Sequence, residues 1–204
     1  MISGSKLIQV FLKSPESGKV KTRLIPDLGV TRATDLHIRL CNKVLAVVST
    51  CGAPVECWVS GDISHPFIQD LSSRHKLCSQ AGIDLGERMY NALLFGLQKH
   101  TKVILVGADA YSLTADYIKD AFEQLEHHDV VLGPAADGGY ILVGAKRLHP
   151  NMFSDIDWGT DLVLKQQLEN VSRCLLSCFL LETRWDIDEL QDIQEYAPEL
   201  LNDQ

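Results

Sequence analysis

The stretch KVILVGA, residues 102–108, decides the fold class of this chain. Its apolar residues follow one another without alternating polar positions, which is typical of a strand buried on both faces of a parallel sheet. The continuation, DAYSL at residues 109–113, places one carboxylate, Asp109, among small neighbours at the strand end. Such an acid is either a turn residue or a ligand, and other segments must distinguish the two.

Segments of strand and helix character alternate along most of the chain, which predicts an α/β sheet with helices on both faces. Asp84 and Thr114 each precede a helical pattern as an N-cap residue would. Further helices are expected over 31–49, in a short segment at 65–75, from about Asp161, and from about residue 190 to the last apolar positions. The other predicted strands are KLIQVFL (6–12), PVECWVS (54–60), KLCSQ (76–80), DVVLGPA (129–135), GYILVGA (139–145) and CLLSCFLLE (174–182).

The Asp-Gly-Gly turn at 137–139 joins two of these strands and predicts a small antiparallel excursion in a mostly parallel sheet. No linker, repeat or low-complexity segment is present, so a single domain over 1–204 is expected.

Composition narrows the class of protein. The chain has 204 residues, 46% hydrophobic and 23% charged, as in globular proteins, and its net charge of −8 argues against a general nucleic-acid binder. No signal peptide pattern and no apolar run approaching ~18 residues occur, so we expect a cytoplasmic protein without a membrane span. A homo-oligomer is compatible with the sequence.

The six cysteines form no CxxC pair and predict reduced, packed thiols. Cys174 and Cys178 fall in one predicted strand, about 13 Å apart, too far for a shared metal ion or a disulfide.

Ligands of open α/β sheets bind beyond the carboxyl ends of the strands, and polar clusters of this sequence fall there. The first such loop, KSPESGKVKTRL (13–24), combines Lys13, Lys21 and Arg23 with Gly18. Lys and Arg donate charge-assisted hydrogen bonds to phosphate oxygens. The loop is therefore either a polyphosphate site or a solvated basic loop.

The segment SQAGIDLGERM (79–89) offers Gln80, whose amide could read a base edge through one donor and one acceptor. Gly82 would let a flat ring approach closely. Arg88 is a second phosphate contact or a surface residue.

Two further segments carry chemistry. Asp137, Gly138 and Gly139 form either a plain turn or a wall for a sugar or acceptor, and Trp158 either packs in the core or stacks on the acceptor. Asp186 and Asp188 are separated by one residue, so in an extended segment both can reach one Mg²⁺ at ~2.1 Å. Capping of the last helix would explain Asp188 but not Asp186.

Five segments in this order, FLKSPESGKVKTRL, QAGIDLGERM, GADAYSL, GPAADGGYILVG and WDIDELQDI, resemble bacterial glycosyltransferase-like proteins of the nucleotide-diphospho-sugar transferase superfamily. Members are often described as arsenosugar-biosynthesis-type glycosyltransferases. Molybdenum-cofactor and phospholactate guanylyltransferases are more distant relatives. The resemblance spans Phe11 to about Ile193.

The resemblance implies a GT-A-type, Rossmann-like, three-layer α/β/α fold that binds a nucleotide with Mg²⁺ or Mn²⁺. It matches the basic loop to the phosphates, Gln80 and Gly82 to the base, and Asp109 with Asp186 and Asp188 to the metal. The family pattern after the strand is Gly-x-Asp-x-Pro-x-Leu, and Tyr111 stands here in place of the proline. A bulky ring at that position is expected to affect the acceptor side.

These observations favour a metal-dependent transferase that takes a nucleotide or nucleotide-sugar and passes the glycosyl group to a small-molecule acceptor. Asp109, Lys21 and Arg23 are the expected catalytic residues. One alternative is a nucleotidyltransferase that joins a nucleoside triphosphate to a small phosphorylated acid and releases pyrophosphate. Another is a nucleotide-binding protein without catalysis.

Overall fold

The computed structural model describes residues 5–202, and its strands join one seven-stranded sheet in the order β3-β2-β1-β4-β6-β5-β7. Only β6 is antiparallel to its neighbours, β4 and β5, and the remaining neighbours pair in parallel. The predicted mostly parallel sheet with an antiparallel excursion is confirmed. The strands are β1 (Lys6–Lys13), β2 (Val55–Ser60), β3 (Lys76–Ser79), β4 (Lys102–Gly107), β5 (Val130–Pro134), β6 (Tyr140–Ala145) and β7 (Cys178–Leu180).

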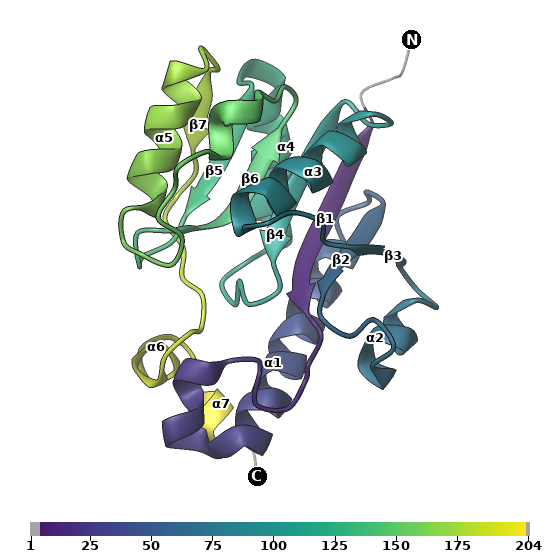
Figure 1. Ribbon diagram of the computed structural model, residues 1–204, viewed down its shortest axis with the longest axis vertical. Helices are drawn as coiled ribbons and strands as arrows, with labels where there is room; N and C mark the ends of the chain where they lie inside the picture. The colour runs from purple at the N-terminus through teal and green to yellow at the C-terminus, as the bar shows by residue number, and fades with distance from the viewer. Residues whose placement is uncertain (1–4, 203–204) are drawn as a thin grey trace.

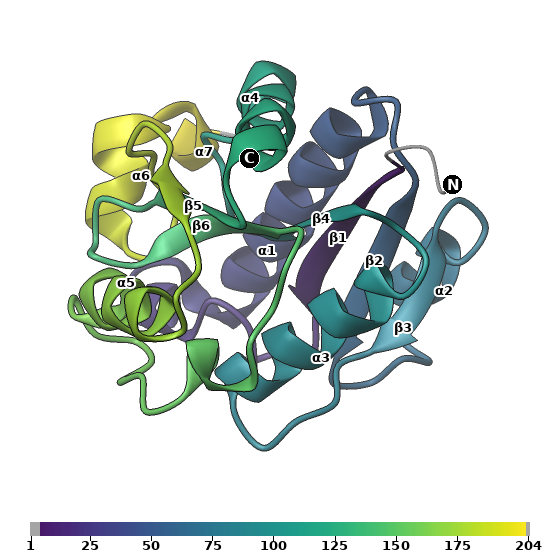
Figure 2. The same cartoon turned by 90° about the horizontal axis from the view of Figure 1, so that it is seen from above.

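Helices cover both faces of the sheet and give three layers (Figures 1 and 2). The helices α1 (Ile25–Ser49), α2 (Pro66–Leu71) and α4 (Ala115–His127) pack on one face, and α3 (Leu85–Leu97) and α5 (Val163–Arg173) pack on the other. The short α6 (Leu190–Tyr196) and α7 (Glu199–Asn202) lie against the first half of α1. Two 3-10 turns complete the helical elements, η1 (Thr22–Leu24) and η2 (Pro150–Phe153).

Two helices begin at the predicted caps. The Asp84 carboxylate accepts a hydrogen bond from the Glu87 backbone N–H at 2.8 Å, and the Thr114 hydroxyl accepts one from the Tyr117 N–H at 3.2 Å. Each bond satisfies a backbone donor that the first helical turn leaves without a partner.

Three boundaries differ from prediction. α1 begins at Ile25 rather than Thr31, because Pro26 suits a first helical turn; Gly29, at φ 77° and ψ 163°, then kinks the helix. β7 is only three residues long, because Cys174 is the C-cap of α5 and the chain turns at Leu175, with φ 55°. Cys174 and Cys178 therefore do not share a strand. The last predicted helix is divided into α6 and α7 around Pro198, which cannot continue a helix.

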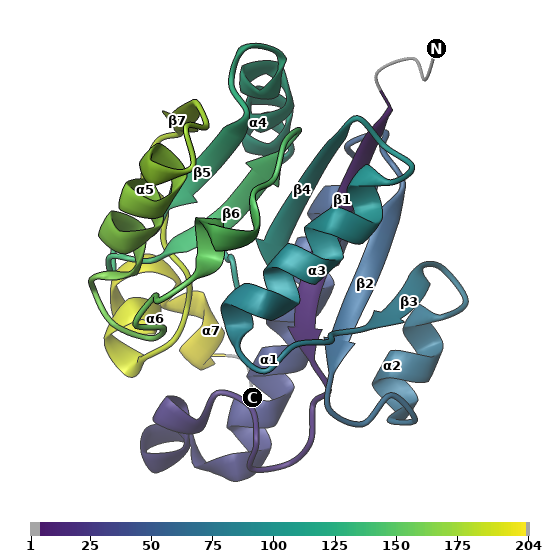
Figure 3. The same ribbon diagram turned by 45° about the horizontal axis from the view of Figure 1, so that its top comes forward.

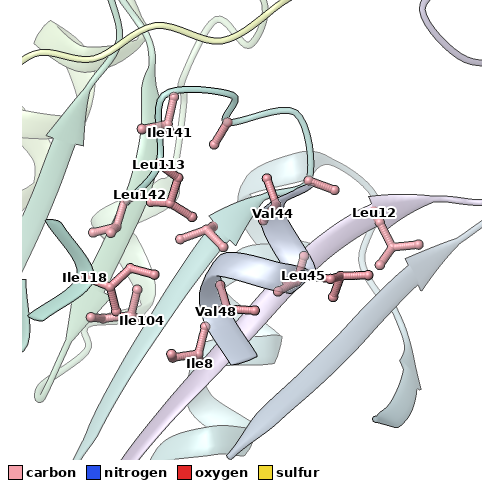
Figure 4. Close-up of a cluster of buried hydrophobic side chains, with 14 of the residues drawn as sticks. Ile8, Leu12, Val44, Leu45, Val48, Ile104, Leu113, Ile118, Ile141 and Leu142 are labelled. Carbon is pink, nitrogen blue, oxygen red and sulfur yellow. The ribbon is translucent and has the colours of Figure 1, made fainter. Parts of the chain in front are cut away.

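The core under α1 and α4 is made from the central strands. Ile8 of β1, Ile104 of β4 and Leu142 of β6 face Val48 of α1 and Ile118 of α4 (Figure 4). All five side chains are almost completely buried, and their burial supplies the main force that holds these layers together.

All six cysteines are free thiols, as predicted. Within residues 5–202, no helix combines the length and apolar character that crossing a bilayer requires.

Candidate functional site

A cavity of about 500 Å³ lies where the central strands end. Lys13, Ser60, Gln80 and Gly107 come from the carboxyl ends of β1, β2, β3 and β4. Because β6 is antiparallel, its first residue, Tyr140, reaches the same edge. Figure 3 shows the arrowheads of β1 and β2 pointing to this edge, from which the chain leads from β1 to α1. The position is the one where ligands bind in open α/β sheets.

Most of the residues predicted for the site line this cavity. They are Lys13, Lys21, Arg23, Gln80, Arg88, Asp109, Asp137, Gly139, Trp158, Asp186 and Asp188. Gly18, Gly82, Gly138 and Tyr111 are not among its lining residues. The polar residues thus converge from loops that are far apart in the sequence, although their chemical roles remain predictions.

A cluster of opposite charges occupies one end of the cavity. The Lys21 ammonium lies 3.1 Å from an Asp109 carboxylate oxygen and 2.7 Å from an Asp188 oxygen. Its side chain is only 5% exposed, so these two ion pairs are its main compensation for leaving water. Arg23 adds weaker contacts, 3.8 Å from Asp188 and 3.6 Å from Glu189. The ion pairs thereby hold the carboxylates of Asp109 and Asp188 next to the Lys21 ammonium.

The protonation of this cluster follows from burial and from neighbouring charges. Burial disfavours the charged form of Lys21, but the two carboxylates outweigh it and hold the lysine pKa above its ordinary value. Burial likewise opposes ionisation of Asp109, and the Lys21 ammonium lowers the pKa of that carboxyl nevertheless. Among residues 5–202, no cation forms an ion pair with Asp186. Burial, reinforced by the charges of Asp109 and Asp188, raises the pKa of Asp186 to about 7.

The raised pKa of Asp186 predicts a pH-dependent stability in the absence of metal. Between about pH 4 and pH 7 the folded protein holds a proton that the unfolded chain has released, so stability falls as pH rises through this window. The Asp186→Asn variant lacks this loss. We compare the unfolding free energies of the variant and the wild type in EDTA. The variant's value minus the wild type's should be at least about 1 kcal/mol larger at pH 8 than at pH 5. Urea unfolding at both pH values measures the difference, and a constant difference would contradict the prediction.

The loop that carries Lys21 is held to the end of β2 and the residues that follow it by hydrogen bonds. The Ser14 N–H donates to the Ser60 carbonyl at 2.8 Å, and the Glu16 side chain accepts from the Asp62 N–H at 3.3 Å. Lys21 itself has φ 45°, a conformation that costs a non-glycine residue of order 1–3 kcal/mol. The ion pairs to Asp109 and Asp188 keep the chain in this conformation.

Ser112 joins the Asp109 loop to the segment that carries Asp186. Its hydroxyl donates to the Trp185 carbonyl and accepts from the Trp185 N–H, the latter at 3.0 Å. The residue next along the chain from Trp185 is Asp186, so this pair of bonds sets the distance between the two acidic segments.

Removing the Ser112 hydroxyl takes this partner from the Trp185 N–H and leaves the Trp185 carbonyl with the Ser112 backbone N–H, at 3.4 Å. We expect Ser112→Ala to lower the unfolding free energy by about 1–3 kcal/mol, the cost of buried polar groups that lose a partner. Ser73→Ala is the matched control, since Ser73 is exposed at the end of α2 and should change stability by less than about 0.5 kcal/mol. Equal urea midpoints for the two variants would refute the structural role of Ser112.

Tyr111 lies outside the cavity, contrary to its predicted place on the acceptor side. Its hydroxyl donates to the Glu199 carboxylate of α7, and the Lys43 ammonium lies 2.9 Å from the centre of its ring. Its ring also packs with the apolar cluster that joins α1 to α6. The side chain that replaces the family proline thus anchors the C-terminal helices.

The cavity is also lined by two aromatic rings and a turn, from Tyr140, Trp158 and Asp137. The Tyr140 hydroxyl donates to the Gln167 side chain at 3.0 Å, so the ring and not the hydroxyl faces the cavity. Trp158 meets Tyr140 edge to face, with ring centroids 6.5 Å apart. Asp137 accepts from the Gly139 N–H at 2.9 Å and stabilises the turn.

Three of the predicted glycines do not line the cavity, and each lies where the backbone conformation or close packing favours glycine. Gly138, at φ 89°, packs against the backbone of Asp161, where a Cβ would collide. A Cβ on Gly82 would come within 2.7 Å of the Arg88 nitrogen. Gly18 lies in the basic loop at φ 76° with open space around it. Close packing or a positive φ accounts for each of them.

Gln80 offers the cavity less than predicted. Its side-chain nitrogen donates to the carbonyls of Trp58 at 2.9 Å and Leu12 at 3.4 Å. Both amide hydrogens are thus directed to the backbone, and only the amide oxygen is available to a ligand.

Sequence reasoning did not anticipate His37, which lines the cavity from α1. Its ring nitrogen lies 2.9 Å from the Lys13 carbonyl, and burial lowers the pKa of the imidazole. A histidine between the apolar positions Leu36 and Leu40 of a helical face was the available signal.

A family model described as "Uncharacterized protein conserved in bacteria (DUF2064)" matches residues 44–160, more than half of the chain. The chain belongs to this family. No curated protein matches the DUF2064 chain in sequence.

Solved structures support the fold resemblance stated from the sequence. A "putative nucleotide-diphospho-sugar transferase" from Desulfovibrio desulfuricans G20 is 28% identical, with 98% of this chain and 95% of that chain covered and a TM-score of 0.85. The 4-diphosphocytidyl-2C-methyl-D-erythritol synthase of Anaerococcus prevotii DSM 20548 is 13% identical, covers 98% of both chains and has a TM-score of 0.62.

A nucleotidyl transferase from Methanothermobacter is also 13% identical, with 98% of this chain and 99% of that chain covered and a TM-score of 0.60. The DUF2064 chain has the Rossmann-like α/β fold of the nucleotide-diphospho-sugar transferases, as its sequence predicts.

Proposed function

We propose that this protein is a transferase that binds a nucleotide or nucleotide-sugar in the cavity and passes a group to a small-molecule acceptor. The observation that carries the proposal is the convergence of Lys21, Arg23 and Asp109 with Asp186 and Asp188 at the carboxyl edge of the sheet. Basic side chains beside acids suit a diphosphate and its counter-ion better than they suit a neutral ligand.

Each part of the cavity has a proposed task. Lys13, Lys21, Arg23 and Arg88 would neutralise phosphate oxygens, and the Gln80 amide oxygen would accept a hydrogen bond from the base. Fixed charges of this kind stabilise the leaving group without having to reorganise during the reaction. Trp158 and the Asp137–Gly139 turn would hold the acceptor.

A divalent cation, Mg²⁺ or Mn²⁺, belongs to the proposal. Three carboxylates, Asp109, Asp186 and Asp188, are hard oxygen ligands of the kind these ions prefer. Burial raises the pKa of Asp186, and the negative charges of the other two carboxylates raise it further. When bound, the ion would neutralise the charge that develops on the phosphate leaving group. In the structure, however, the Lys21 ammonium stands between two of the three acids.

Glycosyl transfer is the leading form of the reaction, because a structure described as a "putative nucleotide-diphospho-sugar transferase" is 28% identical to the DUF2064 chain and shares its fold with a TM-score of 0.85. Nucleotidyl transfer is the second candidate, supported by the nucleotidyl transferases that share the fold. A non-catalytic nucleotide binder is the third candidate. Its support would come from a bulky Tyr111 ring on the acceptor side, but that ring contacts Glu199 of α7 and is not among the lining residues of the cavity.

A thermal-shift panel tests the proposal. Nucleoside diphosphates, triphosphates and nucleotide-sugars are each added with Mn²⁺ and with EDTA, and a ligand of the folded state raises the melting temperature. We expect at least one nucleotide to do so more strongly with Mn²⁺. Release of pyrophosphate rather than a nucleoside diphosphate would then assign nucleotidyl transfer. The absence of any nucleotide-dependent shift would refute the proposed function.

A further inference from the structure

A lysine side chain of the protein, Lys21, lies between the carboxylates of Asp109 and Asp188. The Lys21 ammonium bonds to Asp109 and Asp188 at 3.1 and 2.7 Å, and its side chain is 95% buried. An ammonium has three donors, so two are committed to these carboxylates and one is left for a ligand in the cavity. Lys21 thus contacts both acids at the place where the predicted metal ion would need them.

A divalent ion and this ammonium cannot use the two carboxylates at the same time. An ion bound by Asp109 and Asp188 would lie ~2.1 Å from their oxygens, within the space the ammonium now fills, and like charges so close repel strongly. Among residues 5–202, no group of three or more acidic, histidine or cysteine side chains is arranged to hold a metal ion. The cluster in its present arrangement therefore suits a lysine and not a free ion.

A phosphate in the cavity would change this balance. Lys21 carries its charge on a flexible four-carbon stem, and phosphate oxygens offer it a second anionic partner. The same phosphate supplies oxygen ligands to an ion, as nucleotides commonly do for Mg²⁺. Phosphate would thus both draw the ammonium away from the acids and complete the coordination of the incoming ion.

We propose that Lys21 makes the site select the metal–nucleotide complex over the free metal ion. Without nucleotide, the ammonium excludes divalent cations from Asp109 and Asp188; with nucleotide, it turns to the phosphates and the ion enters with them. This inference rests on the proposed function, because it assumes that the ligand of the cavity carries phosphate. It assigns Lys21 a specificity role in addition to phosphate binding.

Titration of the nucleotide-free protein with Mn²⁺, followed by the EPR signal of the free ion, tests the proposal. Lys21→Met removes the competing charge and is expected to bind Mn²⁺ at least tenfold more tightly than the wild type. Lys21→Gln, which keeps polarity without charge, should show the same gain. Lys21→Arg keeps the charge and should show none.

Two controls locate the effect. Lys119→Met removes an exposed lysine of α4 that is not among the lining residues of the cavity, so it should leave Mn²⁺ affinity unchanged. Asp109→Asn in the Lys21→Met background should abolish the gain. Circular dichroism establishes whether each variant is folded. If Lys21→Met does not fold, Lys21→Gln takes its place in the comparison of Mn²⁺ affinities.

The results separate this inference from the proposed function. Equal Mn²⁺ affinities of the wild type and the folded neutral variants, whether tight or weak, would overturn it. A gain in the neutral variants together with no nucleotide-induced thermal shift in the wild type would leave a lysine-guarded cation site but refute the nucleotide transferase.

Discussion

The Asp109→Asn variant is expected to bind nucleotide at least tenfold more weakly than the wild type when Mn²⁺ is present, and to differ little from it in EDTA. Asparagine keeps the shape of the side chain but removes the charge that Lys21 contacts at 3.1 Å. It is also a poorer ligand for a hard divalent cation than a carboxylate. The loss should therefore appear mainly in the metal-dependent part of binding.

Thermal shift at fixed nucleotide concentration measures this loss. A ligand at a hundred times its Kd stabilises the folded state by ~2.7 kcal/mol, and each tenfold loss of affinity removes about 1.4 kcal/mol of it. Asp70→Asn is the control, because Asp70 lies on α2 with 68% of its side chain exposed and pairs only with Arg74 in the part of the chain described. Equal nucleotide shifts for Asp109→Asn and the wild type with Mn²⁺ would exclude a role of Asp109 in holding the ion.

Ile104→Ala is expected to be among the most destabilising single changes in the sheet. Ile104 is fully buried in β4 between the central strands and the helices α1 and α4 (Figure 4). Replacing it with alanine removes about three carbon atoms from a close-packed core and leaves a cavity, which costs about 2–5 kcal/mol. At ~2–4 °C per kcal/mol for a chain of this size, the melting temperature should fall by roughly 5–15 °C.

Ile63→Ala provides the comparison, because Ile63 is 43% exposed in a loop and its truncation should cost less than about 0.5 kcal/mol. Differential scanning calorimetry of both variants checks the contrast. A similar melting temperature for Ile104→Ala and the wild type would mean that this part of the core is not packed as described.

The sequence predicts the fold well because its strongest signals are local. The uninterrupted apolar run at 102–108 is β4, and the caps at Asp84 and Thr114 begin α3 and α4. Boundaries fail where a single residue overrides the periodic pattern. The periodic pattern predicts a start of α1 after Gly29, whereas the helix begins before it, at Ile25. The turn at Leu175 makes the last strand shorter than its apolar run.

The candidate site was predictable as a set of residues but not as an arrangement. Ligands of open α/β sheets bind at the carboxyl ends of the strands, and this rule predicts that Lys21, Asp109 and Asp188 lie at one edge. No periodicity or spacing could show that the lysine would stand between the two acids, because that contact joins residues 88 and 167 positions apart. For the same reason the contact between Tyr111 and Glu199 was not visible in the sequence.

The cluster of Lys21, Asp109 and Asp188 also has a consequence for biosynthesis. The chain emerges from the ribosome from its N-terminus, so Lys21 and Asp109 are available long before the segment from Trp185 to Asp188 has been translated. Until that segment docks through Ser112, the site lacks two of its three acids. A chain that stops before Asp186 contains the residues of all seven strands but only one of the three carboxylates that converge at the cavity. Assembly of this charged cluster thus requires translation through Asp188.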